Sequence, residues 1–426
     1  MTDSHIMITG VGVVTPIGAD VASFWEGCLA GTSGLTHDVD MDLSPLPCGW
    51  TMGRIPAHVK WALRERWGGR HQTWNDTLLH AVVEQALMDA QVPQSAAKPI
   101  GFLWGQAGTD PDCAFPEEYE GHIADLLALH ELSGGDPAAL VRLDAERARP
   151  AVGTERTVLP RELSERYGVP VVAARIEAAC SGGLRAIVEG ARLLRLNKVG
   201  LAVVSLAMTR NTPFVVSQYA QIMALSRWQG EARQASMPFD RRRSGMVLGE
   251  AAAALVLETA EHAAARGADP YAAIGGWSLG SDSSHITAPS TDALERVIRG
   301  ALECANVSRE GIDVVNAHGT STPLNDITEA RALHRVLGEQ MARIDVHAVK
   351  SLTGHGSAAS GLVESVAAAL TLRHNVVPPT VTCTEPDPEC GVRTSLVPVV
   401  KPVRAVLKNS LGFGGHFSSM VFTQPG

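Results

Sequence analysis

Apolar positions along the chain form two kinds of pattern that alternate with each other. Short continuous apolar runs, bounded by Gly, Pro or polar residues, are typical of buried strands. Such runs occupy residues 6–14, 99–104, 171–176, 201–206 and 252–257. Between two of them, apolar residues recur at helical spacing from Thr77 to Ala90, which predicts an amphipathic helix. Strands that alternate with helices predict a layered α/β architecture.

The later part of the chain repeats this organisation. Its segment 271–280 echoes the apolar and Gly-rich segment 6–14. The elements predicted after it are helices at 292–305 and 326–337 and a strand near Val346. We therefore expect two similar halves, an N-terminal half at 1–258 and a C-terminal half at 259–426.

Composition and charge narrow the functional classes. Hydrophobic residues make up 45% of the 426 residues, which is enough for a large core. The net charge of −9 disfavours nucleic acid as a partner, because nucleic acid needs a basic face. No apolar run approaches the roughly 18 residues of a membrane span, and no secretory signal opens the sequence. We expect a cytoplasmic protein that binds neither nucleic acid nor membrane.

Two common ligand signatures are weak in this sequence. The seven cysteines are scattered and none forms a CxxC pair, so neither a disulfide framework nor a zinc site is predicted. The segment from Gly10 to Gly12 resembles a dinucleotide loop only superficially, because the third glycine and a following acidic residue are missing. We therefore expect no metal and no bound cofactor.

Cys180 lies between the strand predicted at 171–176 and an amphipathic helical pattern that follows Gly183. A thiol at a strand-to-helix turn faces unpaired N–H groups and the positive end of the helix dipole, which lower a thiol pKa. Small neighbouring residues let a substrate approach the backbone closely. A lone cysteine before a helix is, however, more often a buried small residue.

Two histidines far along the chain favour the chemical interpretation. His318 and His355 each lie in a loop rich in Gly, Ser and Thr, at 317–322 and 350–355. One cysteine with histidines gathered around it by the fold is the arrangement of a thiol nucleophile. The three segments together predict that Cys180 is reactive.

The motifs around these residues resemble those of the β-ketoacyl synthases of the thiolase superfamily, specifically the elongating type that acts on acyl carrier proteins. The matching motifs are TGVGVVTPIG at 9–18, ACSG at 179–182, PFDRRRSG at 238–245, AHGTST at 317–322, KSLTGH at 350–355 and NSLGFGG at 409–415. The resemblance covers nearly the whole chain. It implies a five-layered α-β-α-β-α fold of two pseudo-duplicated halves, and an obligate dimer.

The resemblance also implies a role for each reactive residue. Cys180 takes an acyl group from a carrier thioester. His318 and His355 assist decarboxylation of malonyl-acyl carrier protein and stabilise the enolate oxygen that forms. The enolate then attacks the thioester on Cys180 in a Claisen condensation, giving β-ketoacyl-acyl carrier protein and carbon dioxide. Substrates arrive on the 4'-phosphopantetheine arm of the carrier protein.

Further positions match supporting residues of the family. They are Lys350 and Glu364, which would orient the histidines, Thr320 and Thr322, which would line the pantetheine tunnel, and Phe413, which would act as a gate. Backbone N–H groups of Cys180 and Phe413 would hold the oxyanion of the tetrahedral intermediate. A structural lysine at 350 and a helix-surface carboxylate at 364 are the alternatives. Asn325 and Asp326 with Glu329 are interpreted as a helix start with a capping box. Structural roles are expected for Asp240, Arg243, Glu250 and His285.

Some segments depart from the family pattern. Ser244 replaces an aspartate, Ala251 replaces a glycine, and His416 changes the residues after the double glycine. An insertion around 110–149 in the N-terminal half is longer and more acidic than expected. In the family this region lies near the dimer interface and the floor of the acyl pocket. It leaves fatty-acid synthesis and type II polyketide or polyene synthesis both open.

Two other functional classes compete with this interpretation. A thiolase or chalcone-synthase-like enzyme that uses coenzyme A is disfavoured by the pair of His318 and His355. A non-catalytic partner subunit, similar to the chain-length factors, is disfavoured by Cys180, because those factors typically carry glutamine at this position. A folded but inactive subunit stays an alternative. The dimer is accordingly either a homodimer or a heterodimer with a ketosynthase-like subunit.

A basic cluster predicts where the carrier protein docks. Acyl carrier proteins are acidic, so their partner needs a local cationic patch even at a net charge of −9. The cluster consists of Lys60, Arg64, Arg66 and Arg70. Lys60 and Arg64 are four residues apart and share a face if the segment is helical. The alternative is a solvated helix face without a partner.

Overall fold

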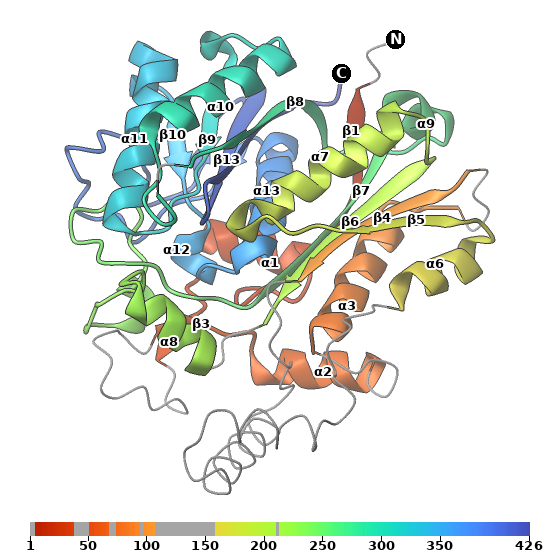
Figure 1. Ribbon diagram of the computed structural model, residues 1–426, viewed down its shortest axis with the longest axis horizontal. Coiled ribbons are helices and arrows are strands. Elements are labelled where there is room, and N and C mark those ends of the chain that lie inside the picture. Colours follow the sequence, from red (N-terminus) through yellow and green to blue (C-terminus); the bar gives the residue numbers. More distant parts are fainter. Residues whose placement is uncertain are drawn as a thin grey trace, which may run out of the picture.

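The computed structural model of the chain describes residues 5–37, 51–67, 74–93, 98–106, 158–209, 213–283 and 285–426 (Figure 1). Arg70 of the predicted docking cluster and the predicted insertion at 110–149 lie outside the described residues. The strands of both predicted halves are described, and their pairing shows how the architecture is built.

Five strands belong to the N-terminal half. They are β1 (Ile6–Val14), β4 (Ile100–Gln106), β5 (Val171–Arg175), β6 (Leu201–Met208) and β7 (Ala251–Thr259). They pair in the order β5-β4-β6-β7-β1, in which β7 alone is antiparallel to its neighbours. The strands predicted from the apolar runs are confirmed, with small shifts at their ends.

The C-terminal half repeats this arrangement. Its strands are β8 (Ala272–Ser281), β9 (Val314–Asn316), β10 (Asp345–His347), β13 (Ala405–Gly412) and β14 (His416–Thr423). They pair in the order β10-β9-β13-β14-β8, in which β14 alone is antiparallel to its neighbours. Numbered within each half, both orders read third, second, fourth, fifth, first. The predicted duplication is thereby confirmed, whereas the boundary at 258/259 stays a prediction.

The two halves meet where β1 pairs with β8. The register joins Ile6 to Ile274, Met7 to Ala273 and Ile8 to Ala272, and the strands are antiparallel. Because this seam is short, most of the contact between the halves comes from helices that lie between their sheets.

Helices form three layers around the two five-stranded halves (Figure 1). On the outer faces, α3 (Trp74–Asp89) packs on β1 and β7, and α10 (Thr291–Ala305) packs on β8 and β14 beside α11 (Pro323–Leu337). Between the halves, α7 (Gly182–Arg195) and α13 (Ser357–His374) contact each other and strands of both. The predicted five-layered α-β-α-β-α fold is confirmed.

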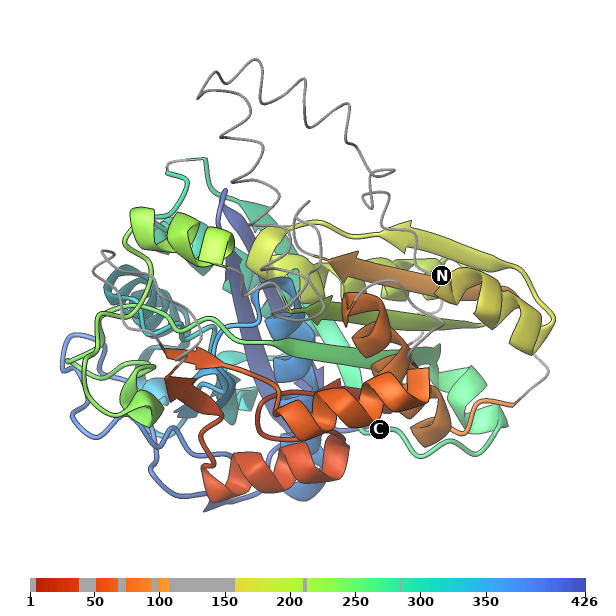
Figure 2. The ribbon, with the colours of Figure 1, turned by 90° about the horizontal axis from the view of Figure 1, so that it is seen from below.

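Shorter elements complete the described chain. The helices are α1 (Val21–Ala30), α2 (Ala57–Trp67), α6 (Leu159–Tyr167), α8 (Pro213–Gln221), α9 (Ala260–Ala265) and α12 (Lys350–Thr353). The short strand pairs are β2 (Leu35–His37) with β3 (Thr51–Gly53), and β11 (Val376–Val377) with β12 (Val399–Val400). Strand β5 lies at the opposite end of the molecule from α11 and is an edge strand among the strands that the structure describes (Figure 2).

Helix α13 is buried on all sides. Every residue from Ser357 to Leu372 is buried, and many of them are Ala, Ser or Gly, which lets the neighbouring elements approach closely. The start of α7 crosses α13 at Gly183, where a Cβ atom would lie 2.6 Å from the backbone nitrogen of Leu362. This crossing places the residues before α7 next to the residues before α13.

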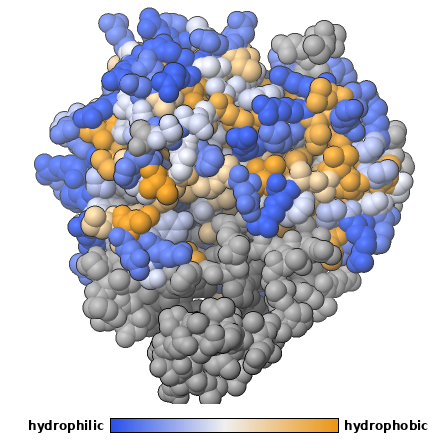
Figure 3. Space-filling model, in the orientation of Figure 1, coloured by the Kyte–Doolittle hydropathy of each residue, from blue (hydrophilic) through white to orange (hydrophobic). Residues whose placement is uncertain are grey.

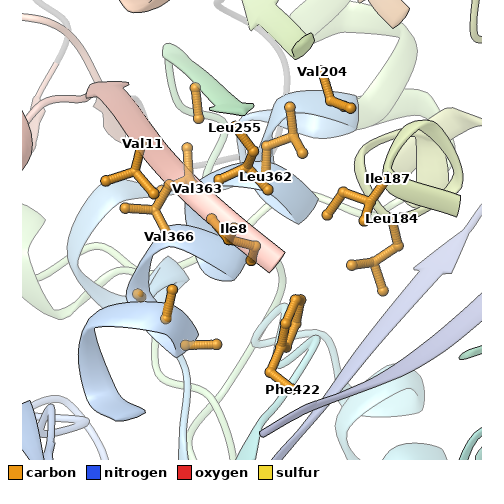
Figure 4. Packing of buried hydrophobic residues seen from close by; sticks show 14 of the residues in the cluster. Ile8, Val11, Leu184, Ile187, Val204, Leu255, Leu362, Val363, Val366 and Phe422 are labelled. Carbon is orange, nitrogen blue, oxygen red and sulfur yellow. The ribbon is translucent and has the colours of Figure 1, made fainter. Parts of the chain in front are cut away.

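Larger apolar side chains fill the space around the crossing. Leu184 and Ile187 of α7 lie near Leu362 of α13, and Ile8 of β1 and Phe422 of β14 close the cluster from the sheets (Figure 4). One buried cluster therefore draws on both halves, which makes the central layer the main part of the core.

Candidate active site

Cys180 occupies a tight turn between β5 and α7. It is the middle residue of a 3₁₀ turn, Ala179–Ser181, and its side chain is only 6% exposed. Ala179 before it has a φ of 45°, a left-handed conformation that is uncommon for a residue other than glycine. Such strain persists only where the surroundings hold it, and it is frequent at reactive sites. The turn fixes the direction of the thiol.

His355 is hydrogen-bonded directly to this thiol. Its Nε2 lies 3.1 Å from Cys180 Sγ, and its Nδ1 lies 3.1 Å from Ser360 Oγ. The residue is held from behind, because its backbone N–H donates to the carbonyl of Val247 at 2.7 Å. The predicted pair of a thiol and an imidazole is therefore close enough for proton transfer.

His318 completes a compact group with the other two residues. Its ring lies 5.5 Å from the His355 ring, in an edge-to-face arrangement. Lys350 Nζ donates to the His318 carbonyl at 2.7 Å and lies 3.3 Å from His318 Nδ1. A lysine ammonium has donors only, so Nδ1 accepts and the ring proton is on Nε2. Lys350 thereby leaves the Nε2–H of the His318 ring as a donor, on the side of the ring away from the lysine.

Glu364 is buried among lysines. Its Oε1 binds Lys350, and its Oε2 lies 2.7 Å from Nζ of a second buried lysine, Lys408. Lys350 and Glu364 are therefore placed beneath the histidines, and neither lies on a surface. The sequence reasoning did not identify Lys408. The available signal was a lysine directly after the apolar residues 405–407 of the same strand, where a charge without a partner would be costly.

The capping interpretation of residues 325–329 is wrong in part. The N-cap of α11 is Thr322, whose side chain accepts from the backbone N–H of Asn325. Glu329 instead accepts from the backbone N–H groups of His318 and Gly319, at 2.8 and 2.9 Å. Glu329 of α11 therefore holds the loop of His318. This role depends on a contact between the helix and the loop that precedes it.

Burial decides the protonation of the reactive groups. Burial raises the pKa of the Cys180 thiol to about 11, although the nearby Lys350 charge acts in the opposite direction. The lowered thiol pKa predicted from the helix terminus is therefore wrong, because desolvation of the thiolate outweighs the favourable charges. Burial and then Lys350 hold the pKa of His355 well below its ordinary value. The resting pair is a neutral thiol that donates to a neutral imidazole.

The end of β13 lies against the turn of Cys180. A Cβ atom on Gly412 would lie 2.9 Å from the carbonyl of Ala178 and 3.2 Å from the backbone nitrogen of Cys180. The following Phe413 is half-buried and contacts Tyr219 of α8, with ring centroids 6.2 Å apart. Gly412 is thus required for the backbone of the Phe413 loop to lie against the turn of Cys180.

A cavity leads from the surface to the three reactive residues. Thr320 and Thr322 line it, with their hydroxyl oxygens 3.0 Å apart. Its other lining residues include Met246, Ile286, Pro289, Leu411, Phe413 and Phe417. The walls are therefore mainly apolar. Asp282, His285, Thr287 and Asn325 add polar groups to the two hydroxyl groups and the reactive residues.

The expected structural residues have structural contacts. Asp240 pairs with Arg242 at 2.9 Å, and Arg243 pairs with Asp387 at 2.5 Å. Nδ1 of His285 accepts backbone N–H groups of the same loop, from Thr287 and Ala288 at 3.1 Å each. These side chains hold the segments around the cavity.

The described members of the predicted docking cluster differ in their exposure and in their partners. Lys60 Nζ lies 2.7 Å from Oε1 of the buried Glu250 and above the ring of Trp74, which favours a structural role for this lysine. Arg64 and Arg66 are exposed near the C-terminal end of α2. Among the described members of the cluster, these two are therefore the most exposed.

Sequence comparison identifies the family. The chain matches the family described as beta-ketoacyl synthase, N-terminal domain, over residues 3–263, and the one described as beta-ketoacyl synthase, C-terminal domain, over residues 271–384. The chain belongs to the β-ketoacyl synthase family. The predicted family is thereby confirmed, and with it the class of condensing acyltransferases.

Relatives named as carrier-protein synthases and as polyketide synthases are similarly distant from this ketosynthase. It is 30% identical to "3-oxoacyl-[acyl-carrier-protein] synthase 2" of Coxiella burnetii, over 100% of the chain and 99% of the relative. It is 33% identical to "Granaticin polyketide putative beta-ketoacyl synthase 1" of Streptomyces violaceoruber, over 99% and 98%. Among solved structures, "The ishigamide ketosynthase/chain length factor" aligns with a TM-score of 0.82 and 29% identity, over 99% and 100%.

The surface gives one further finding. No helix in the described ranges is both long and apolar enough to cross a bilayer. Hydrophilic residues cover much of the described face seen in Figure 3, and hydrophobic residues are dispersed among them.

Proposed function

We propose that this protein is an elongating ketosynthase that condenses an acyl chain held on Cys180 with malonyl-acyl carrier protein. The observation that carries the proposal is the contact of 3.1 Å between His355 Nε2 and Cys180 Sγ, with His318 directly beside it. The group combines a nucleophile, a base and a second imidazole whose Nε2–H is a donor. These are the groups that acyl transfer and enolate stabilisation require.

Acyl loading is the first step. The sulfur of Cys180 attacks the thioester carbonyl of the acyl carrier protein, and its proton moves to Nε2 of His355. The backbone N–H groups of Cys180 and Phe413 hold the oxyanion of the tetrahedral intermediate. When the intermediate collapses, the bond to the pantetheine sulfur breaks, and His355 returns the proton to this leaving group. Because the thiol has a raised pKa, the base is needed during the attack.

Decarboxylation and condensation follow in the same cavity. The malonyl carboxylate leaves as carbon dioxide, and its bonding electron pair forms an enolate on the remaining acetyl thioester. Nε2–H of His318 donates to the enolate oxygen. His355 supplies a second donor when its proton is on Nε2, because the Ser360 hydroxyl can then donate to Nδ1. The enolate carbon attacks the acyl carbonyl on Cys180, and the sulfur leaves as a thiolate that is reprotonated.

Intact-mass analysis tests the proposal. Incubation with acyl-loaded carrier protein is expected to add one acyl mass to the protein, and Cys180→Ala should remove the adduct. Cys304→Ala is the matched control, because Cys304 is an exposed cysteine on α10 outside the cavity lining. An adduct that persists in Cys180→Ala, or no adduct at all with wild-type protein, would exclude an active ketosynthase. The second result would favour a non-catalytic partner subunit.

The partner surface is proposed at β5. Residues Val172 to Arg175 are exposed, Val172 by 40%, and β5 is the last strand of the sheet on its side within the described residues. An exposed apolar edge strand is a template for pairing with another chain. We infer that β5 pairs with a second copy or with a ketosynthase-like subunit. The similarity to "The ishigamide ketosynthase/chain length factor" supports a partner of the second kind. Val172→Pro, compared with wild type by light scattering, should shift the mass toward the monomer.

We propose a carrier-bound acyl chain as the substrate class. The mainly apolar lining of the cavity favours a carrier-bound acyl chain, and the hydroxyl groups of Thr320 and Thr322 could hydrogen-bond a pantetheine amide. Relatives from fatty-acid and polyketide synthesis support the class equally. Extension assays with acyl carrier proteins that bear saturated and poly-β-keto chains would distinguish the two uses. The predicted effect of the insertion at 110–149 on chain length is tested by shortening it.

A further inference from the structure

Lys408 is a buried charge that no motif of the family resemblance included. It is fully buried in β13, at 0% exposure, and its ammonium lies 2.7 Å from Glu364 Oε2. Its second partner is the backbone carbonyl of Asn409. A buried charge is costly unless it is paired, and β13 is otherwise built of apolar and small polar residues. The position of this lysine therefore calls for a function beyond packing.

Lys408 controls how Glu364 binds Lys350. The Lys350 ammonium has three N–H donors and three neighbouring acceptors, namely Glu364 Oε1, the His318 carbonyl and His318 Nδ1. Without Lys408, both oxygens of Glu364 would attract Lys350. With Lys408 on Oε2, Glu364 offers Lys350 only Oε1. A donor of Lys350 is then left for the His318 ring.

We propose that Lys408 is a positioning residue of the condensing site, which acts through Glu364 and Lys350 to keep the proton of His318 on Nε2. The inference rests on the proposed function, because a donor at His318 Nε2 is what enolate stabilisation requires. Lys408 touches neither substrate nor thiol. Its effect passes through two buried ion pairs and one hydrogen bond.

The charges around the histidines come from four elements. Lys350 of α12 and Lys408 of β13 are the cations, and Glu364 of α13 and Glu329 of α11 are the carboxylates. His347 of β10 is uncharged, because burial lowers its pKa to about 3. The neutral thiol of Cys180 faces His355 from the turn before α7. The cluster is thus balanced, with two cations against two carboxylates.

Removal of Lys408 should shift the pKa values of both histidines in one direction. Burial lowers the pKa of both histidines most strongly, Lys350 adds to the effect, and Lys408 acts in the same direction. Loss of the Lys408 charge should therefore raise both pKa values. An imidazole that is already protonated cannot accept the thiol proton, so the acid limb of acyl loading should move to higher pH in such a variant.

Lys408→Met provides the test. In a Cys180→Gln background, which removes the nucleophile, it is expected to slow decarboxylation of malonyl-acyl carrier protein by about tenfold. In the background with Cys180, acyl loading at pH 8 should change by less than about threefold, with its acid limb moved upward. Nitrogen-15 spectra of labelled histidines should show that Nδ1 of His318 loses its acceptor character.

Lys401→Met is the matched control. Lys401 also binds a buried carboxylate, Asp345, at 2.5 Å in the same half of the protein, but neither histidine. It should lower the melting temperature without changing the histidine spectra or the acid limb. In Lys408→Ala, added methylammonium should restore part of the decarboxylation rate, because it can replace the missing ammonium in the space left by the side chain.

The outcomes separate this proposal from the proposed function. If wild-type protein does not decarboxylate malonyl-acyl carrier protein, the proposed function fails, while the histidine spectra still test the role of Lys408. If Lys408→Met retains wild-type histidine spectra and acid limb, Lys408 is structural and the proposal is overturned. If Lys408→Met does not fold, Lys408→Gln, which keeps a hydrogen-bond donor, is measured in the same way.

Discussion

The residues that follow the third strand of each half can be compared directly, because the two halves share one topology. In the N-terminal half, β5 leads into the turn of Cys180 and then into α7. In the C-terminal half, β10 leads through Lys350 and His355 into α13. Equivalent positions of the repeat thus carry a thiol in one half and a cation with a base in the other. The crossing of α7 and α13 brings them together.

This difference shows how a duplicated fold can acquire an asymmetric site. No charged side chain lies on the turn of Cys180 itself. The histidines, both lysines and both carboxylates all come from the C-terminal half. One half therefore supplies the atom to be acylated, and the other supplies the charges and protons.

The largest effect on activity should come from removing a histidine that the C-terminal half supplies, in a protein that already lacks the thiol. In a Cys180→Gln background, His318→Ala is expected to slow decarboxylation of malonyl-acyl carrier protein by about 10²- to 10³-fold, because the enolate loses an oriented donor. Measurement is by release of labelled carbon dioxide. The single variant Cys180→Gln should decarboxylate at least as fast as wild type. A wild-type rate in the His318→Ala variant would show that the second half does not stabilise the enolate.

The pH dependence of thiol alkylation sharpens the comparison further. With a pKa of about 11, raised above that of an ordinary thiol by burial, the thiolate fraction of Cys180 keeps growing as pH increases through the neutral range. The rate of alkylation by iodoacetamide should therefore rise about tenfold per pH unit between about pH 7 and pH 9. A rate that levels off near neutral pH would mean that the helix terminus lowers the thiol pKa after all.

A smaller change should loosen the joint between the two halves. Gly183→Ala places a Cβ atom 2.6 Å from the backbone nitrogen of Leu362. Backbone atoms cannot move away as easily as the end of a side chain can. We expect a loss of about 1–3 kcal/mol in the free energy of unfolding, measured with a chemical denaturant. Gly190→Ala on the same helix meets only side-chain atoms, at 3.1 Å or more, and should cost less. Equal costs would show that the crossing at Gly183 is not specially tight.

The smallest effect is expected at the carrier surface. Charge reversal of Arg64 and Arg66 should raise the apparent Michaelis constant for carrier-bound substrate several-fold and flatten its salt dependence, because rim charges mainly set association rates. Turnover of a small pantetheine thioester should barely change. Arg161→Glu, an exposed arginine of α6, is the control. Equal losses with both substrates would place the two arginines in support of the fold.

The sequence predicts some parts of the fold better than others. Apolar runs located the strands of the N-terminal half, because buried strands are continuous in apolar residues. The same criterion missed β13 and β14, whose polar residues satisfy one another across the pair, as Ser419 and Asn409 do at 2.8 Å. Helix α13 lacks a polar face for most of its length, so it has no periodic pattern to detect.

The supporting charges were the least predictable part. Motifs located Lys350 and Glu364, but Lys408 and Glu329 become informative only through partners on other elements. Local spacing suggested that Glu329 belongs to a helix cap, whereas its partners are the backbone N–H groups of the His318 loop. The thiol pKa was misjudged for a related reason: the helix terminus is visible in the sequence, and the degree of burial is not.

The burial of α13 has a consequence for how the protein is made. A ribosome releases the thiol-bearing half first, and the apolar inner faces of β6, β7 and α7 stay uncovered until α13 emerges about a hundred residues later. At typical rates of synthesis, this interval lasts on the order of ten seconds. The nascent chain must be kept from aggregating for that time. The two halves are alike in topology, but the N-terminal half alone would leave exposed the faces that α13 covers.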